Sequence, residues 1–151
     1  MSELINYLKI VSESVRNPKN VQNDLVYPCI EDFVLKNGMA MVKKKSLPEH
    51  VQIMEAKMCF RNAFQTAEKN WGWHYAEGYA FYAFSVIPTL HAWCTDEDGF
   101  VIDPTWKDGK EYYGVEFSLN FVRKTSLRKG TWGVIDDWEN EFPLLRGEPW
   151  R

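Results

Sequence analysis

Three residues of this chain have side-chain types that could act together as a thiol catalytic centre. Cys59, His91 and Asp103 follow one another in that order within 45 residues. A cysteine attacks a carbonyl carbon when a nearby imidazole takes the thiol proton, and a carboxylate can hold that imidazole in the required tautomer. Each residue also has a structural interpretation, because free cysteines are mostly buried, a strand histidine can be a hydrogen-bonded core residue, and Asp-Pro often begins a turn.

Cys59 falls in a stretch that the sequence predicts to be helical. Ser46 is a candidate helix cap and Pro48 would lie in the first turn, which together predict a helix over about 48–70. One continuous helix would place Cys59 in its middle, where the helix dipole has little effect on the thiol. A break near Glu55 would place it at a helix start, where the dipole lowers the pKa of a thiol. The sequence leaves both arrangements open.

His91 and Asp103 fall in a region of strands. Aromatic and β-branched residues predict an antiparallel sheet, with strands at about 75–86, 90–95, 99–103 and 112–122. A three-residue loop over 96–98 would place His91 directly opposite Asp103, with their Cβ atoms about 4.5 to 5.5 Å apart. A two-residue turn at Asp98-Gly99 would instead pair His91 with Trp106 and separate the two side chains.

Four short blocks of the sequence occur in an order that is typical of one enzyme superfamily. They lie within 58–106, about a third of the chain, and read Cys59-Phe60-Arg61-Asn62-Ala63, Glu77-Gly78-Tyr79-Ala80, His91-Ala92-Trp93 and Val101-Ile102-Asp103-Pro104-Thr105-Trp106. In these blocks the chain resembles the transglutaminase-like superfamily of cysteine enzymes. The resemblance implies that Cys59 is the nucleophile, His91 the general base and acid, and Asp103 the residue that orients His91.

The resemblance also implies a fold. It predicts an α+β, papain-like core in which a helix that begins near Cys59 packs on an antiparallel β-sheet carrying His91 and Asp103, with these two residues directly opposed. No cofactor is implied.

Four further residues are candidates for substrate binding or for stabilising the oxyanion. Many members of the family have an aromatic residue or Gln upstream of the cysteine, and Gln52 is the nearest Gln before Cys59. Glu77 could bind substrate or form a structural ion pair. Trp93 and Trp106 follow His91 and Asp103 closely and could shield them from water or simply pack in the core.

Length and composition predict one domain. The chain has 151 residues, of which 45% are hydrophobic, enough for a single core over 1–151. We expect a mainly helical part over about 1–72, a β-sheet part over about 73–124 and an irregular tail over about 125–151. Apolar spacing predicts an N-terminal helix over 4–15 that is ended by Asn17-Pro18, whereas the apolar run 29–35 fits either a helix or a strand.

Charge, apolar runs and cysteine content argue against several classes of protein. A net charge of -3 and a pI near 5.6 disfavour nucleic-acid binding, which usually requires a strongly basic face. No apolar run approaches the roughly 20 residues of a membrane span, and the opening residues lack the positive charge of a signal peptide. Three scattered cysteines do not form a disulfide framework. These features predict a cytoplasmic protein without a membrane segment.

We therefore expect a cysteine-dependent enzyme that forms a thioester at Cys59 from an amide or ester carbonyl of a protein or peptide substrate. Hydrolysis, as in a peptidase, amidase or deamidase, is the favoured outcome because water is always present, and transfer to an amine is the other. One alternative is a catalytically silent module of the same fold, whose aromatic cleft binds or inhibits a protein. Others are an aromatic groove for sugar or RNA, and a zinc site at the same three residues, although the chain has no Cys-x-x-Cys pair and we expect no metal.

Overall fold

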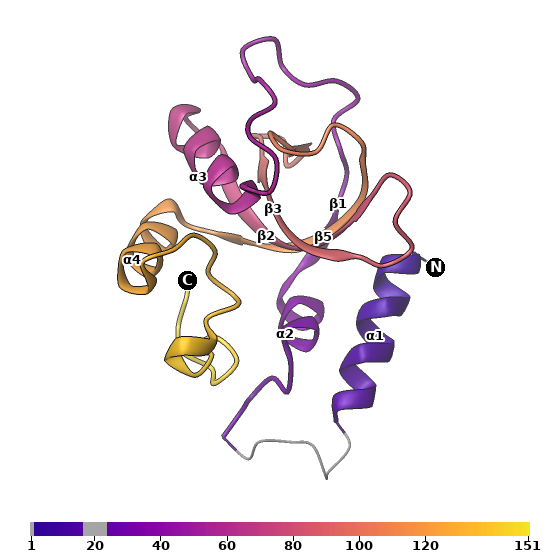
Figure 1. The fold of residues 1–151 in the computed structure, drawn as a ribbon, viewed down its shortest axis with the longest axis vertical. Coiled ribbons are helices and arrows are strands. Elements are labelled where there is room, and N and C mark those ends of the chain that lie inside the picture. Colours follow the sequence, from indigo (N-terminus) through magenta and orange to yellow (C-terminus); the bar gives the residue numbers. More distant parts are fainter. Residues whose placement is uncertain (1, 17–23) are drawn as a thin grey trace.

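A curled antiparallel sheet is the centre of an α+β fold in the computed structural model, which describes residues 2–16 and 24–151 (Figure 1). The sheet has the strand order β1-β5-β2-β3-β4. Its strands are β1 (Met39–Met41), β2 (His74–Tyr82), β3 (Thr89–Thr95), β4 (Val101–Ile102) and β5 (Gly109–Phe117). The helices are α1 (Glu3–Val15), α2 (Ile30–Asn37), α3 (Cys59–Lys69) and α4 (Leu119–Lys129), followed by a short 3-10 helix, η1 (Trp138–Asn140). The α+β class and the antiparallel sheet predicted from the sequence are confirmed.

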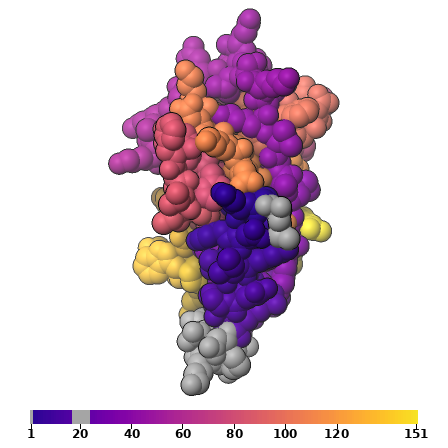
Figure 2. Space-filling view, turned by 90° about the vertical axis from the view of Figure 1, so that its right-hand side faces the viewer, coloured from indigo at the N-terminus to yellow at the C-terminus, as the bar shows by residue number. Residues whose placement is uncertain are grey.

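The N-terminal helix forms where its apolar spacing predicts it. The Ser2 hydroxyl caps α1 by accepting a hydrogen bond from the backbone N–H of Ile5 at 3.3 Å, and Leu4 and Leu8 are buried on one face. Asn17 and Pro18, the predicted end of this helix, lie outside the described residues. In the space-filling view α1 covers the lower part of one face of the molecule (Figure 2).

The predicted helix over 48–70 is wrong in its first half. The helix α3 begins only at Cys59, after Lys57 adopts a left-handed backbone conformation with φ of 65°. The segment before it is tied to another part of the chain, because the backbone N–H of Met54 donates to the carbonyl of Pro104 at 2.7 Å. Of the two positions that the sequence allowed for Cys59, the structure has the one at a helix start.

The fourth predicted strand is also wrong beyond Phe117. The hydroxyl of Ser118 accepts a hydrogen bond from the backbone N–H of Phe121 at 3.1 Å and so caps a helix, α4, instead of continuing the strand. Gly130 ends this helix in a left-handed conformation with φ of 76°. The predicted irregular tail from 125 onward therefore begins inside α4.

The hairpin between β3 and β4 differs from both predicted registers. Thr95 pairs with Val101, so the connecting loop spans 96–100. The carboxylate of Asp96 organises this longer loop by accepting backbone N–H groups of Asp98 at 3.0 Å and Phe100 at 2.9 Å. Because β4 ends at Ile102, Asp103 follows the strand and is not directly opposite His91 in the ladder.

The two edges of the sheet meet, which closes it around a small apolar cluster. After β1, the chain runs beside β4, where the backbone N–H of Val101 donates to the carbonyl of Val42 at 2.8 Å. The enclosed side chains are Met41, Ala76, Ala80, Trp93, Val101 and Tyr112. Gly114 leaves room for the Trp93 ring, because a Cβ atom there would lie 2.7 Å from that ring. Trp93 is consequently packed inside the sheet beside the strand position of His91.

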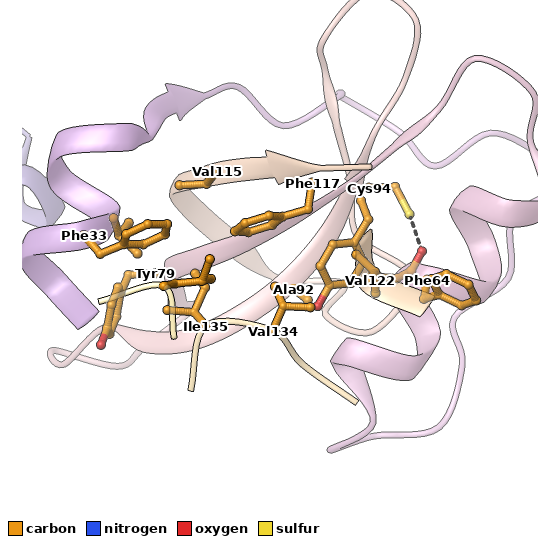
Figure 3. Packing of buried hydrophobic residues seen from close by; sticks show 14 of the residues in the cluster. Phe33, Phe64, Tyr79, Ala92, Cys94, Val115, Phe117, Val122, Val134 and Ile135 are labelled. Atoms are coloured by element: carbon orange, nitrogen blue, oxygen red, sulfur yellow. Dashed lines mark hydrogen bonds between the residues drawn. The ribbon is translucent and has the colours of Figure 1, made fainter. Parts of the chain in front are cut away.

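The larger core lies between the other face of the sheet and the helices. Phe33 of α2, Phe64 of α3 and Val122 of α4 meet side chains of β2, β3 and β5 there (Figure 3). Within residues 2–16 and 24–151, no helix combines the length and apolar character that crossing a membrane requires.

Candidate functional site

The carboxylate of Asp103 accepts four hydrogen bonds in the interior. Its Oδ2 atom accepts from Nε2 of His91 and from the hydroxyl of Tyr112, both at 2.8 Å. Its Oδ1 atom accepts the backbone N–H groups of Thr105 and Trp106, both at 2.9 Å. Burial alone would raise the pKa of Asp103, but the hydrogen bond and charge of His91 and the two backbone N–H groups hold it below its ordinary value. An ionised carboxylate therefore faces His91.

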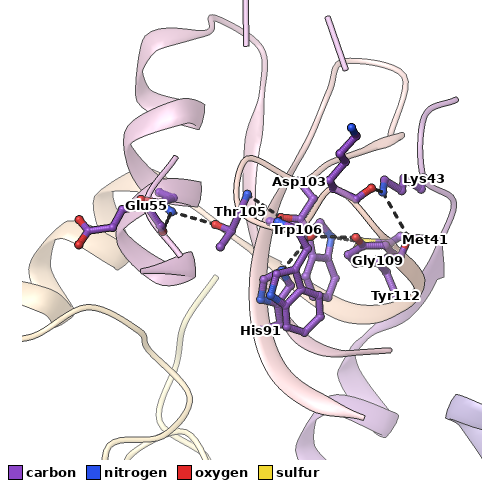
Figure 4. Close-up of polar contacts among 12 residues, drawn as sticks. Met41, Lys43, Glu55, His91, Asp103, Thr105, Trp106, Gly109 and Tyr112 are labelled. Carbon is purple, nitrogen blue, oxygen red and sulfur yellow. Dashed lines mark hydrogen bonds and ion pairs between the residues drawn. The ribbon is translucent and has the colours of Figure 1, made fainter. Parts of the chain in front are cut away.

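The imidazole of His91 is buried and is fixed by a hydrogen bond to Asp103 and by stacking on Trp106. Its side chain is only 1% exposed, and its ring stacks on that of Trp106 with centroids 3.6 Å apart and planes 8° apart (Figure 4). The Trp93 ring lies further away, with its centroid 6.1 Å from that of His91. Because an ionised carboxylate has only acceptors, this hydrogen bond requires a proton on Nε2, and in the neutral imidazole Nδ1 then carries the lone pair. This is the tautomer that a general base at Nδ1 requires.

Cys59 is the first residue of α3 and is 9% exposed. Burial raises the pKa of this thiol to about 11; hydrogen bonding by the backbone of Ala92 opposes the increase, and the negative charges of Glu77 and Asp103 add to it. In the resting protein Cys59 is thus a neutral thiol at physiological pH. An attack by its sulfur requires a base that removes the proton.

The thiol and the imidazole share one hollow. Cys59 and His91 both line a cavity of about 680 Å³. Other residues that line it belong to the segment before α3, to the β2–β3 loop and to the turn that begins at Asp103-Pro104-Thr105, called here the Asp-Pro-Thr turn. Trp106 also lines this cavity, so the ring that covers His91 forms part of its wall. The structure therefore brings Cys59, His91 and Trp106 to one surface, with Asp103 behind His91.

Asn62 connects α3 to the turn that carries Asp103. Its fully buried amide donates to the hydroxyl of Thr105 at 3.0 Å and to the carbonyl of Glu55 at 2.8 Å, and the backbone N–H of Thr105 donates to Asp103. Asn62 and Tyr112 were not predicted as site residues. Asn62 lies three residues after Cys59, on the same helical face, a spacing that could have identified it. No local signal marks Tyr112.

Two of the further candidates lie away from this cavity. Gln52 is exposed and is not among the described residues that line it. Glu77 is fully buried and accepts hydrogen bonds from the hydroxyl of Tyr75 at 2.7 Å and from the backbone N–H groups of Val134 at 2.9 Å and Ile135 at 3.1 Å. Burial raises the pKa of Glu77, although these three donors lower it in part. The Glu77 carboxylate fastens the C-terminal segment to β2.

Trp93, the remaining candidate, and the thiol of Cys94 make structural contacts in the core. Trp93 is buried and its indole N–H donates to the sulfur of Met41 at 3.3 Å. The Cys94 thiol donates to the carbonyl of Ala63 at 3.1 Å and burial raises its pKa, whereas Cys29 is half-buried. In the part of the chain that the structure describes, no three His, Cys, Asp or Glu side chains are grouped so that they could hold a metal ion.

No protein-family model, curated protein or solved structure matches this chain. The resemblance of its four sequence blocks to the transglutaminase-like superfamily therefore stays a prediction.

Proposed function

We propose that this protein is a cysteine-dependent acyl-transfer enzyme with a transglutaminase-like, papain-like core. The observation that carries the proposal is the buried His91–Asp103 pair, whose imidazole lines the same cavity as Cys59 at the start of α3. A nucleophile, a base and an orienting carboxylate in this relation are what thiol catalysis of acyl transfer needs.

In the proposed reaction, Nδ1 of His91 accepts the thiol proton while the sulfur of Cys59 bonds to the carbonyl carbon of an amide or ester. The protonated His91 then gives that proton to the leaving amine or alcohol, and the bond to the leaving group breaks to form a thioester. Water, deprotonated by His91, attacks the thioester and releases a carboxylic acid and the Cys59 thiol. Asp103 keeps the tautomer and stabilises the imidazolium.

The start of α3 supplies the candidate donors for the oxyanion. Gln52 does not line the cavity, whereas the first backbone N–H groups of a helix have no partner within the helix and lie at the positive end of its dipole. We assign the oxyanion to the first turn of α3, next to Cys59. Hydrolysis is the favoured outcome, because transfer to an amine would require an acceptor in competition with water.

A second candidate function is a catalytically silent binding module of the same fold. One observation favours it: burial raises the pKa of Cys59 to about 11, so that the thiol keeps its proton unless His91 removes it. In that case the cavity with the Trp106 wall would hold a peptide without reacting with it.

Trapping the thioester distinguishes the two functions. The protein is mixed with p-nitrophenyl acetate, and intact mass and peptide mapping locate the acetyl group. We expect a hydroxylamine-sensitive acetyl group on Cys59, lost in Cys59→Ser and kept in Cys94→Ser, which changes a thiol that donates only to a backbone carbonyl. Equal consumption of the ester by wild type and Cys59→Ser would overturn the proposal of an enzyme and leave that of a binding module.

A further inference from the structure

A second cavity adjoins the one that contains Cys59. It has a volume of about 520 Å³, and the two cavities share Phe60 and Leu90 as lining residues. Phe60 directly follows Cys59 in the chain and Leu90 directly precedes His91. A substrate whose carbonyl carbon lies at Cys59 would therefore reach the second cavity with its neighbouring groups.

The wall of the second cavity combines aromatic rings with unpaired carboxylates. Trp132 and Trp138 line it, and Trp138 is 66% exposed although it is a large apolar side chain. Asp136 and Glu139 also line it and are exposed, and among the described residues neither takes part in an ion pair. Lys129 lines the same wall and, among the described residues, takes part in no ion pair either, so two exposed carboxylates stand against one cation there.

Of the two cations near this wall, Arg128 is paired with a carboxylate and Lys129 is hydrogen-bonded to neutral carbonyl groups. Arg128 pairs with the buried carboxylate of Asp137 at 2.8 Å. Lys129 donates from Nζ to the backbone carbonyls of Gly133 at 2.9 Å and Asp136 at 2.8 Å, which holds its ammonium against the main chain. Neither cation neutralises the two free carboxylates through a direct contact.

The first part of the segment that forms this wall is anchored to the core of the protein. Glu77 binds the backbone N–H groups of Val134 and Ile135, and the Trp132 ring packs on Phe64 with centroids 5.1 Å apart. A cavity whose wall is fixed before binding discriminates between ligands at a small entropic cost.

We propose that the second cavity is a specificity subsite for a lysine or arginine side chain of a peptide substrate, an inference that rests on the proposed function of Cys59. The aliphatic stem would lie along Phe60 and Leu90, and the cationic head would lie against the indole rings and the carboxylates of Asp136 and Glu139. A glutamate or aspartate side chain at the same position of the peptide would meet like charge.

Binding to a Cys59→Ala protein tests this subsite without any turnover. The probes are the peptides acetyl-Gly-Lys-Gly-amide, its norleucine counterpart and its glutamate counterpart, titrated while the indole N–H signals are followed by NMR. The variants Trp132→Phe and Trp138→Phe assign the two indole signals. We expect these two signals to shift most, and the lysine peptide to bind roughly fivefold more tightly than the norleucine peptide.

A matched pair of variants separates local from overall charge. The double variant Asp136→Asn, Glu139→Gln is expected to remove the preference for lysine. The control Glu13→Gln, Glu49→Gln changes the net charge equally at two exposed sites outside the cavity. This control protein is expected to keep the preference for the lysine peptide. Equal binding of the three peptides, or a lysine preference that survives in the first double variant, would overturn the subsite. Because these proteins lack the thiol, either result is independent of whether Cys59 forms a thioester.

Discussion

Asp103→Asn should reverse the tautomer of His91 while the protein still folds. An amide has one oxygen acceptor and one NH₂ donor, and the Oδ1 position of Asp103 faces two backbone N–H groups that cannot accept. The amide oxygen must therefore take this position, and the NH₂ group must face His91 and Tyr112. The hydroxyl of Tyr112 can accept, and Nε2 of His91 can accept only if its proton moves to Nδ1.

The size of the effect follows from the four hydrogen bonds. In Asp103→Asn the two backbone N–H groups keep a neutral acceptor, and the contacts with His91 and Tyr112 reverse direction. All four contacts lose the charged partner, and hydrogen bonds to charged groups are about twice as strong as neutral ones. We expect the free energy of unfolding to fall by about 2 to 4 kcal/mol. Asp103→Ala would leave four buried donors without partners, a loss comparable with the whole stability of a domain of about 5 to 15 kcal/mol. That variant should not fold.

Heteronuclear NMR of the imidazole nitrogens at neutral pH is the assay, with urea unfolding for stability. Wild type should show a proton on Nε2 of His91, and Asp103→Asn should show it on Nδ1. Acylation of Cys59 should then fall by roughly 10⁴-fold, as in triads with a reversed tautomer. Tyr112→Phe removes one of the four hydrogen bonds and should keep the proton on Nε2. An unprotonated Nε2 in wild type, or a proton that stays on Nε2 in Asp103→Asn, would contradict the assignment.

Three more outcomes are expected. Glu77→Ala removes the acceptor of three buried donors and should lower the free energy of unfolding by about 3 kcal/mol or more in urea titration, with faster amide exchange at Val134 and Ile135 than in Tyr75→Phe, which removes only the hydroxyl contact. Asn62→Ala should cost about 1 to 3 kcal/mol by the same titration, and an unchanged unfolding midpoint would mean that the link between α3 and the Asp-Pro-Thr turn is not needed. Because the folded protein lowers the pKa of Asp103, its contribution to stability is present above the ordinary carboxyl pKa of about 3.9 and is lost as the pH falls through the lower folded value. Unfolding free energies measured from pH 7 to pH 2 should show this fall, and it should be smaller in Asp103→Asn.

Local patterns predicted the elements whose formation depends on neighbouring residues. The apolar spacing and cap of α1 lie within one short segment, and the aromatic and β-branched runs located β2 and β3 within a few residues. The contact between His91 and Asp103 was also predicted, although it forms by a different route. Asp96 lengthens the hairpin loop, and Asp103 reaches the imidazole from the turn after β4.

The elements that were missed depend on contacts distant in sequence or on competing local signals. The segment before Cys59 has a helix-start pattern, but its backbone binds the turn at Pro104 instead. The β-forming residues around Phe121 led to a predicted strand where the chain forms a helix that Ser118 and Gly130 delimit. Tyr112 reaches Asp103 only because the sheet closes on itself, and no property of a single strand indicates this closure.

We expect His91 to activate the thiol of Cys59, and the rate of alkylation by iodoacetamide as a function of pH tests this most directly. Intact mass follows the reaction in proteins with Cys29→Ser and Cys94→Ser, with and without His91→Ala. At pH 7.5 we expect Cys59 to react at least about 10²-fold faster when His91 is present, the usual contribution of a general base, and His91→Ala to follow a thiol with a pKa of about 11. Equal rates that rise together toward that pKa in both proteins would contradict the claim.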